Sequence, residues 1–317
     1  MGLPFLGETL DFLRIARRDR PWEFLEDRVS GYGSETFKTS LLGFPTVVLA
    51  SPAGNKMAFA NIHVSWPKSV VDVTGSHSLI AHTGSHAHHL RHALHAFLNP
   101  YALQRYTHPL SRIVLASLPH PPHINNITSS SASRSSPPPA EIELLAYPFM
   151  KKLSFSIVCH ILVGIRVAAD QDSLFHHFST LVRGLFQIPI KIPGTRYSKA
   201  IAAASAIKKT IKTVIDKKRV EIASAESAAV SEHQDVLSGL LNFKDEDGKA
   251  LSEEEIKDNI VLLLFAGNDT SSITATMASR YLALHPSIMD EVYEENKEIA
   301  EDKGPGEYHC SGKISRR

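Results

Sequence analysis

Six consecutive residues, Ala266-Gly-Asn-Asp-Thr-Ser271, combine side chains that rarely occur together inside a helix. Glycine costs a helix interior about 1 kcal/mol relative to alanine. Asp, Thr and Ser side chains compete for backbone hydrogen bonds and favour caps and turns. The flanking segments 260–265 and 273–277 are nevertheless apolar and helical in pattern. Because such a local inconsistency is expected where function requires it, Asp269 and Thr270 are candidate catalytic residues.

The element that must position these residues is a long helix whose ends can be read from the sequence. Ser252 and Glu255 form a capping-box pattern at its start, and Pro286 stops it. About 33 residues would span roughly 50 Å. Residues 260–265 are apolar nearly all round, which predicts burial, yet the run is shorter than the ~20 residues a bilayer requires. We expect a central helix of a large soluble domain with a polar notch, residues 266–271, at its midpoint.

The polar notch resembles the oxygen-binding helix signature, Ala/Gly-Gly-x-Asp/Glu-Thr-Thr/Ser, of the cytochrome P450 haem-thiolate monooxygenases. Other segments resemble plant members of this family, in particular those that oxidise triterpenes and sterols, such as the β-amyrin 28-oxidases. These segments are 2–10, 37–49, 51–56, 66–67, 102–106 and 192–196. The resemblance extends to Glu307 and implies a mainly α fold with a small N-terminal β-hairpin.

The resemblance also assigns roles to single residues. In the family, a hydroxyl and a carboxylate on this turn deliver protons during oxygen activation, which Thr270 and Asp269 would do here. Ala266 and Gly267 would adjoin the haem, with Gly267 leaving room by having no side chain. Arg91 lies in a segment similar to the family's Gly-x-x-His-Lys-x-Leu-Arg pattern and would bind a haem propionate. The alternatives are a Thr270 hydroxyl bonded to its own helix beside an exposed Asp269, and a solvated Arg91.

Several family features are missing from the sequence. The axial cysteine of the family lies in a Phe-x-x-Gly-x-Arg-x-Cys-x-Gly loop, and neither this loop nor the family's Glu-x-x-Arg pair occurs here. Cys159 lies in an apolar helical run and is expected to be buried, whereas Cys310 lies in a short polar tail. Ala87 stands where the family usually has a propionate-binding Trp or His. We expect a C-terminally truncated family fold with a divergent tail at 308–317, which a truncated gene model, a splice form or a pseudogene would each produce.

The composition describes an ordinary globular protein. Of 317 residues, 43% are hydrophobic and 21% charged, with a net charge of +1, so there is no electrostatic case for nucleic acid. Two cysteines argue against a disulfide scaffold. The family usually carries an N-terminal anchor to the endoplasmic reticulum membrane. No anchor is apparent here, so we expect a soluble or peripheral protein. The resemblance further implies haem, a lipophilic substrate and an NADPH-dependent reductase, and it allows peripheral membrane contact.

Helices dominate the predicted organisation, and we expect one incomplete domain over residues 1–317. Pro109 and Pro148 should shorten or disturb their helices, and the Ser- and Pro-rich segment 118–139 should be a disordered insertion. A hairpin is predicted at 37–42 and 46–50. The predicted helices are 21–30, 51–61, 85–98, one from 102 onward, 141–164, 172–186, 195–224, 252–285 and 287–302.

Three functions remain open from the sequence. The first is an incomplete haem monooxygenase that oxidises a terpenoid or sterol, and the second is a non-catalytic fragment of the same ancestry. The third is a helical metal-binding module in which His88, His92 and His95 share a face. Because no residue offers a thiolate in the family's context, we expect that this chain does not form a thiolate-ligated haem. We also expect poor solubility, because residues 260–265 would lose packing partners.

Overall fold

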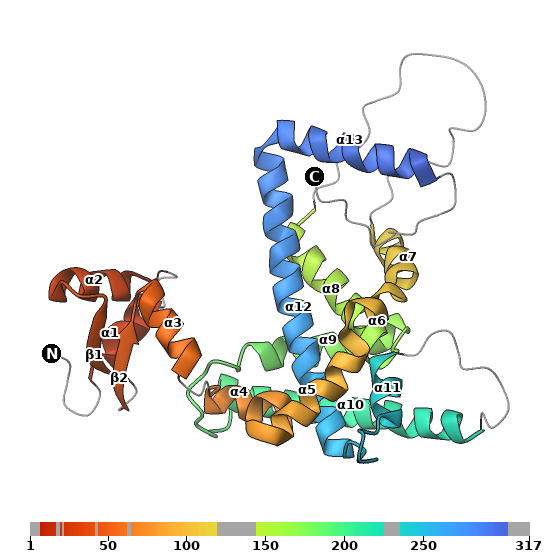
Figure 1. Cartoon of the computed structure of the whole chain (residues 1–317), viewed down its shortest axis with the longest axis horizontal. Coiled ribbons are helices and arrows are strands. Elements are labelled where there is room, and N and C mark those ends of the chain that lie inside the picture. The colour runs from red at the N-terminus through yellow and green to blue at the C-terminus, as the bar shows by residue number, and fades with distance from the viewer. Residues whose placement is uncertain are drawn as a thin grey trace. The chain divides into compact units, whose positions relative to one another are not determined.

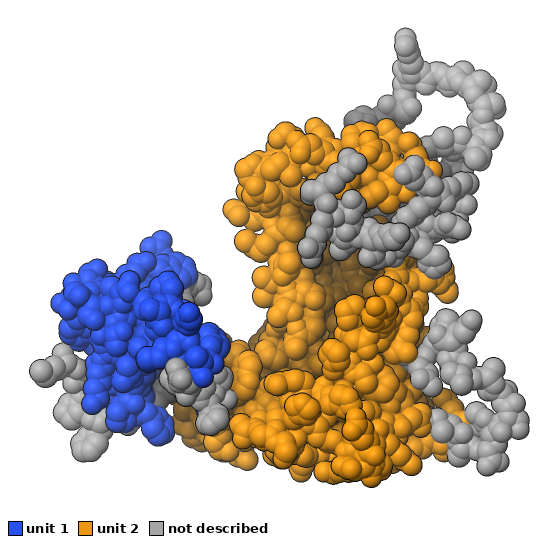
Figure 2. Space-filling view, viewed as in Figure 1, with its two compact units in different colours: residues 1–65 blue, residues 66–317 orange. Residues whose placement is uncertain are grey.

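The computed structural model describes residues 7–16, 20, 22–41, 44–61, 65–118, 144–224 and 235–303. Its contacts divide the chain into two compact units, Met1–Ser65 and Trp66–Arg317 (Figures 1 and 2). The fold is mainly α, as predicted, and the described residues contain one two-stranded sheet. Of the expected insertion at 118–139 only Leu118 is described, and the expected tail at 308–317 lies outside the described residues. The single domain over 1–317 stays a prediction.

The first unit is a hairpin with three helices. Helices α1 (Thr9–Ala16) and α2 (Trp22–Tyr32) precede strands β1 (Thr36–Leu41) and β2 (Phe44–Leu49), and α3 (Pro52–Asn61) follows. The strands pair antiparallel with Phe37 opposite Val48, which confirms the predicted hairpin. Phe37 and Phe24 of α2 are buried. The hydroxyl of Ser51 accepts a hydrogen bond from the Gly54 N–H at 3.1 Å, so Ser51 caps α3.

The second unit consists of helices around one apolar core. Helix α8 lies along α12, and α9 lies along α10 (Figure 1). The elements are α4 (Lys68–Thr74), the short 3-10 turn η1 (Leu79–Ala81), α5 (Gly84–Leu98), α6 (Pro100–Gln104), α7 (Thr107–Ser117), α8 (Ala146–Val163), α9 (Ala168–Val182), α10 (Arg196–Ser224), α11 (Val236–Asn242), α12 (Glu253–Leu284) and α13 (Pro286–Lys303).

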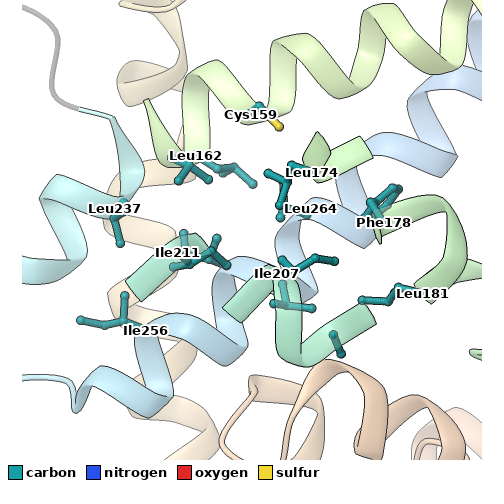
Figure 3. Close-up of a cluster of buried hydrophobic side chains, with 14 of the residues drawn as sticks. Cys159, Leu162, Leu174, Phe178, Leu181, Ile207, Ile211, Leu237, Ile256 and Leu264 are labelled. Atoms are coloured by element: carbon teal, nitrogen blue, oxygen red, sulfur yellow. The ribbon is translucent and has the colours of Figure 1, made fainter. Parts of the chain in front are cut away.

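The core of the second unit lies where α8, α9, α10, α11 and the first half of α12 meet. Figure 3 shows Cys159 of α8 in this cluster, together with Ile207 and Ile211 of α10 and Leu264 of α12. All four side chains are fully buried. The buried apolar side chains of α10 recur with a helical period of about 3.6 residues, so one face of this helix packs against the core.

Helix α12 begins where the sequence predicts. The Ser252 hydroxyl accepts a hydrogen bond from the Glu255 N–H at 3.2 Å, and a Glu255 carboxylate oxygen accepts one from the Ser252 N–H at 2.7 Å. This reciprocal capping box satisfies two backbone donors at the helix end. The helix continues without interruption through the polar notch to Leu284.

Several helical predictions need correction. The short helices α4 and α11 were not expected, because seven residues show too little periodicity to be recognised. The helix expected from residue 102 is two helices, α6 and α7, and Pro109 lies in the first turn of α7, where proline is tolerated. Helix α8 begins at Ala146 rather than at 141, with Pro148 in its first turn, so the helix is shorter than predicted and its middle is undisturbed. Helix α9 ends at Val182 rather than at 186.

The predicted loss of packing around residues 260–265 is wrong for the side chains that face the core, whereas Leu263 and Phe265 are only partly buried. Ile260, Val261 and Leu264 are fully buried, because α8, α10 and α11 cover the first half of α12. The exposed apolar side chains of α12 lie further along the helix, at Ile273, Met277, Tyr281 and Leu284.

Candidate functional site

The polar notch lies where α12 meets α8. A Cβ atom built on Gly267 would lie 3.3 Å from Cγ2 of Val158, which is tighter than most such contacts. Next to it, the Ser154 hydroxyl donates a hydrogen bond to the carbonyl oxygen of Asn268 at 3.3 Å. Gly267 therefore allows the two helices to approach closely. Its position beside a cofactor stays a prediction.

Thr270 and Ala266 lie on an exposed face of the notch, one turn apart. The Thr270 hydroxyl donates a hydrogen bond to the Ala266 carbonyl oxygen at 2.6 Å. This hydrogen bond to the backbone one turn earlier is the one that the alternative interpretation of Thr270 predicts. A hydroxyl that donates in this way still has lone pairs that can accept a hydrogen bond from a bound molecule.

Asp269 is held on the other side of the same turn, against α8. Its Oδ1 atom lies 3.6 Å from the Lys151 ammonium and accepts a hydrogen bond from the Asn268 side-chain amide at 3.3 Å. The side chain of Asp269 is only 18% exposed, so the freely solvated aspartate of the alternative interpretation is not observed. Lys151 was missed from the sequence, because nothing local in α8 marks it as a partner of a residue more than a hundred positions away.

Asn268 is the most buried polar residue of the notch. The residue is 0% exposed, and its Oδ1 atom has no hydrogen-bond partner among the described residues. A buried acceptor without a partner costs free energy. The notch thus contains an unsatisfied amide, an ion-paired carboxylate and a hydroxyl within three residues.

Arg91 does not join this group in the structure. It is exposed on α5, and within the described residues it makes no hydrogen bond or ion pair with residues 266–271. An exposed guanidinium is free to bind an anionic group such as a propionate. The role of Arg91 in cofactor binding stays a prediction.

The histidines of α5 do not form a metal centre. His88, His92 and His95 are exposed, and the described part of the chain contains no group of three or more His, Cys, Asp or Glu side chains placed to hold a metal ion. Two other histidines of α5 instead pair with carboxylates. The His86 ring lies 3.2 Å from Glu255 of α12, and the His89 ring lies 3.0 Å from Asp245.

The described residues fit the oxygen-binding side of a haem, but they do not supply the thiolate ligand of its other side. The notch offers a hydroxyl, a carboxylate and small residues, which suits the oxygen-binding side that the resemblance implies. Cys159, however, is 0% exposed in the core, and burial raises the pKa of its thiol well above the usual range. Cys159 therefore does not supply a thiolate ligand, and Cys310 lies outside the described residues.

A cavity of about 380 Å³ lies beside α8 but belongs to a different surface. Residues of α7, α8 and α9 line it, among them Ser117, Phe149 and Phe175. None of its lining residues comes from α12, so this cavity is not part of the notch.

Comparisons with known proteins identify relatives over nearly the whole chain. A β-amyrin 28-monooxygenase from Vitis vinifera is 36% identical over 311 residues, which is 97% of this chain and 61% of the relative. A taxane 13-alpha-hydroxylase from Taxus cuspidata is 34% identical and is covered to 60%. The chain thus spans about three fifths of the length of these relatives.

A solved structure and a family profile agree with these relatives. A retinoic acid-bound cyanobacterial CYP120A1 superposes with a TM-score of 0.75 at 26% identity, covering 95% of this chain and 62% of that protein. The profile described as cytochrome P450 matches residues 2–314. Since this match includes almost every residue, and since the long helix lies where the sequence predicts it, the chain belongs to the cytochrome P450 family.

Proposed function

We propose that the chain carries part of the site of a haem monooxygenase whose substrate is a lipophilic terpenoid or sterol. The observation that carries this proposal is the polar notch in an unbroken α12, within a chain that matches the family over its length. The named activities of the relatives support the substrate class, because β-amyrin 28-monooxygenase and taxane 13-alpha-hydroxylase are both named for terpenoid substrates.

Thr270 and Asp269 are the residues that we assign to proton handling. The exposed Thr270 hydroxyl can accept a hydrogen bond from a bound molecule while it donates to its own helix. Asp269 and Lys151 form a partly exposed pair behind it, so a proton can pass from solvent to the carboxylate. Ala266 and Gly267 would adjoin the cofactor, and Arg91 would bind a propionate.

Haem would supply oxygen activation at its iron, with a reductase as the electron source in this family. A thiolate ligand is required for this chemistry, and Cys159 is unsuited to provide it. We therefore infer that the 317-residue polypeptide does not by itself form a thiolate-ligated haem. The second candidate function, a non-catalytic member of the family, rests on this same observation.

The carbon-monoxide difference spectrum of the reduced protein, reconstituted with haem, tests this inference. We expect no red-shifted thiolate-type Soret band. Cys159→Ser and Cys310→Ser variants serve as matched controls. A thiolate-type band that disappears in Cys310→Ser and persists in Cys159→Ser would identify Cys310 as the ligand and overturn the inference.

The family's partners and location follow as further proposals. A lipophilic substrate and an NADPH-dependent reductase are the expected partners, and the endoplasmic reticulum membrane is the expected location. Contact with that membrane would be peripheral for the residues described here. Co-fractionation of the protein with microsomes, and its release by carbonate, would test a peripheral attachment.

A further inference from the structure

Three histidine rings follow one another where η1 leads into α5. His82 directly follows η1, and His86 and His89 lie in the first two turns of α5. The His82 and His86 rings meet edge to face with their centres 4.4 Å apart, and the centres of the His86 and His89 rings are 6.5 Å apart. We call these three residues the histidine row.

His82 is the member of the row that is least able to hold a second proton. It is partly buried, and its Nε2 atom is buried without a hydrogen-bond partner among the described residues. A proton added there would create a buried N–H without an acceptor, which costs free energy. Burial and the neighbouring His86 and His77 rings lower the pKa of His82 below its usual 6.5, although Glu255 and a hydrogen bond with the Ser76 backbone act in the opposite direction.

His86 and His89 differ from His82 because each of them faces a carboxylate. Nε2 of His86 lies 3.2 Å from Glu255, and Nδ1 of His89 lies 3.0 Å from Asp245. Nε2 of His89 is also buried without a partner, but a charge on this ring would be paired with Asp245. Protonation of either ring therefore leaves a pair of opposite charges that keeps α5 attached.

Hydrogen bonds from α12 fix the entry to η1. Oδ1 of Asn259 accepts a hydrogen bond from the Leu79 N–H at 2.8 Å, and the Asn259 side-chain amide donates one to the His77 carbonyl oxygen at 3.3 Å. The Asp258 carboxylate accepts a further one from the His77 N–H at 3.0 Å. The end of η1 thus lies between two attachments, one before it at residues 77–79 and one after it at His86.

We propose that the histidine row is an acid-released latch, in which His82 takes up a proton in mildly acidic solution and leaves its buried position, so that the end of η1 opens while α5 stays attached. In the open form the His82 ring is in water, where a histidine has a pKa near 6.5. Because the pKa is lower in the closed form, the closed form loses stability as pH falls from 6.5 toward that lower value.

Other ionisable groups near the row change this balance but do not titrate in the same range. Carboxylates favour a charge on the row and oppose release, whereas neighbouring cations favour release. The carboxylates are Glu255, Asp258 and Asp245, and the cationic or titratable groups are His77, Lys208 and Lys249. Between pH 7.5 and 5.5, histidine is the side chain that ordinarily changes charge.

Hydrogen exchange of the full 317-residue chain tests the latch without haem, substrate or activity. The N–H groups of Ala81 and His82 donate to the carbonyl oxygens of Ser78 and Leu79 at 2.9 and 3.4 Å, so they exchange when the end of η1 opens. Their protection factors, corrected for the intrinsic pH dependence of exchange, are compared at pH 7.5 and 5.5. Amides of the buried part of α10, around Ile207, report whether the whole unit opens.

We expect the protection of the Ala81 and His82 amides to fall by up to about tenfold, which is the largest factor that one proton with an open-state pKa near 6.5 supplies at pH 5.5. Protection in α10 should stay nearly constant. The variant His82→Asn retains a side-chain amide donor but does not titrate, so it should abolish the fall. His176→Asn is the matched control, since His176 is exposed on α9, and it should behave like the original chain.

Three results would overturn the proposal. These are no fall in the original chain, an equal fall in α10, and a fall at Ala81 that persists in His82→Asn. A cooperative thermal transition at pH 7.5 shows that this variant folds, and His82→Gln replaces it if it does not. If neither variant folds, the original chain decides, because a fall confined to the end of η1 supports the latch and either of the first two results refutes it.

Discussion

At the scale of single residues, the site depends on how closely two helices can approach. The missing side chain of Gly267 lets α8 pass with Val158 next to the α12 backbone. The unfavourable helix propensity of Gly267 is thus offset by the close packing of α8 against α12. It also keeps Asn268 and Asp269 in contact with Ser154 and Lys151 of α8.

Replacing Gly267 by leucine should therefore force α8 and α12 apart. We expect a loss of about 1–3 kcal/mol in the free energy of unfolding, the usual range for overpacking. Urea denaturation measures this change. Ala266→Leu, at the exposed neighbouring position, should change stability little, and adding Val158→Ala to Gly267→Leu should restore part of the loss. Equal effects at positions 266 and 267 would contradict the close approach of the helices.

Cys159 gives a second prediction at this scale. Burial raises the pKa of its thiol, so the reactive thiolate is scarce in the folded protein. In a Cys310→Ser variant, Cys159 is the remaining cysteine. We expect a thiol reagent to label it only as the protein unfolds, so that the labelling rate rises along the urea transition. Rapid labelling under native conditions would show that Cys159 is accessible.

At the scale of elements, the N-terminal end of α12 forms several charged contacts with other elements, and we call Glu255 and Asp258 with their partners the junction. Glu255 caps the helix and faces His86 of α5. Asp258, one turn later, accepts a hydrogen bond from the His77 N–H and pairs with Lys208 of α10 at 2.6 Å. These contacts connect α12 to the segment after α4, to α5 and to α10, so this end of the helix is fixed while its other end is exposed.

The junction predicts a loss of stability in acid. Burial alone would raise the pKa of Glu255, but hydrogen bonds from the Ser252 N–H and hydroxyl and the nearby charges of His86 and Lys249 together hold it below its usual 4.5. A carboxyl with a lowered folded-state pKa adds stability above its unfolded pKa and loses it as pH falls through the folded value. The free energy of unfolding should therefore decline as pH falls below about 4.5.

A glutamine variant isolates this contribution. Glu255→Gln should flatten the acid limb of a plot of unfolding free energy against pH. Glu298→Gln, at an exposed position on α13, should retain the original slope. If both variants keep that slope, the lowered pKa of Glu255 is not a source of the acid sensitivity.

At the scale of the whole molecule, burial is uneven along α12 and α13. The first half of α12 lies in a well-packed core, whereas apolar side chains of its second half and of α13 are exposed. We call the first group the α12 stripe (Ile273, Met277, Tyr281 and Leu284) and the second the α13 face (Met289, Val292 and Tyr293). Contiguous exposed apolar surface of this kind is uncommon in soluble proteins and promotes association. Poor solubility thus remains our expectation, but for this surface and not for residues 260–265.

Solubility should respond to charge at the stripe. We expect Met277→Glu/Tyr281→Glu to reduce aggregation of the isolated chain, measured by static light scattering over a concentration series. Val220→Glu adds the same kind of charge elsewhere and should have a smaller effect. If one added carboxylate at position 220 is as effective as two at the stripe, net charge and not the stripe governs solubility.

The candidate site residues could be proposed from the sequence, but the residues that contact them could not. Asp269 and Thr270 are identified by a local conflict between side chain and helix, which needs no knowledge of the fold. Lys151 and Val158 come from α8, more than a hundred residues earlier, and no local pattern connects them to the notch. Two ion pairs of α5 were missed for the same reason. His86 pairs with Glu255 of α12, and His89 pairs with Asp245 in the loop before α12.

The sequence by itself determined the hairpin, the long helices and the cap of α12, because hydrophobic period, capping residues and prolines act within a few positions. Only the tertiary structure decided which apolar side chains of α12 are buried. Ile260 and Ile273 are chemically identical, yet one is fully buried and the other is 50% exposed. The physical reason is that burial depends on which other segments pack against a helical face, and the helix sequence alone does not contain that information.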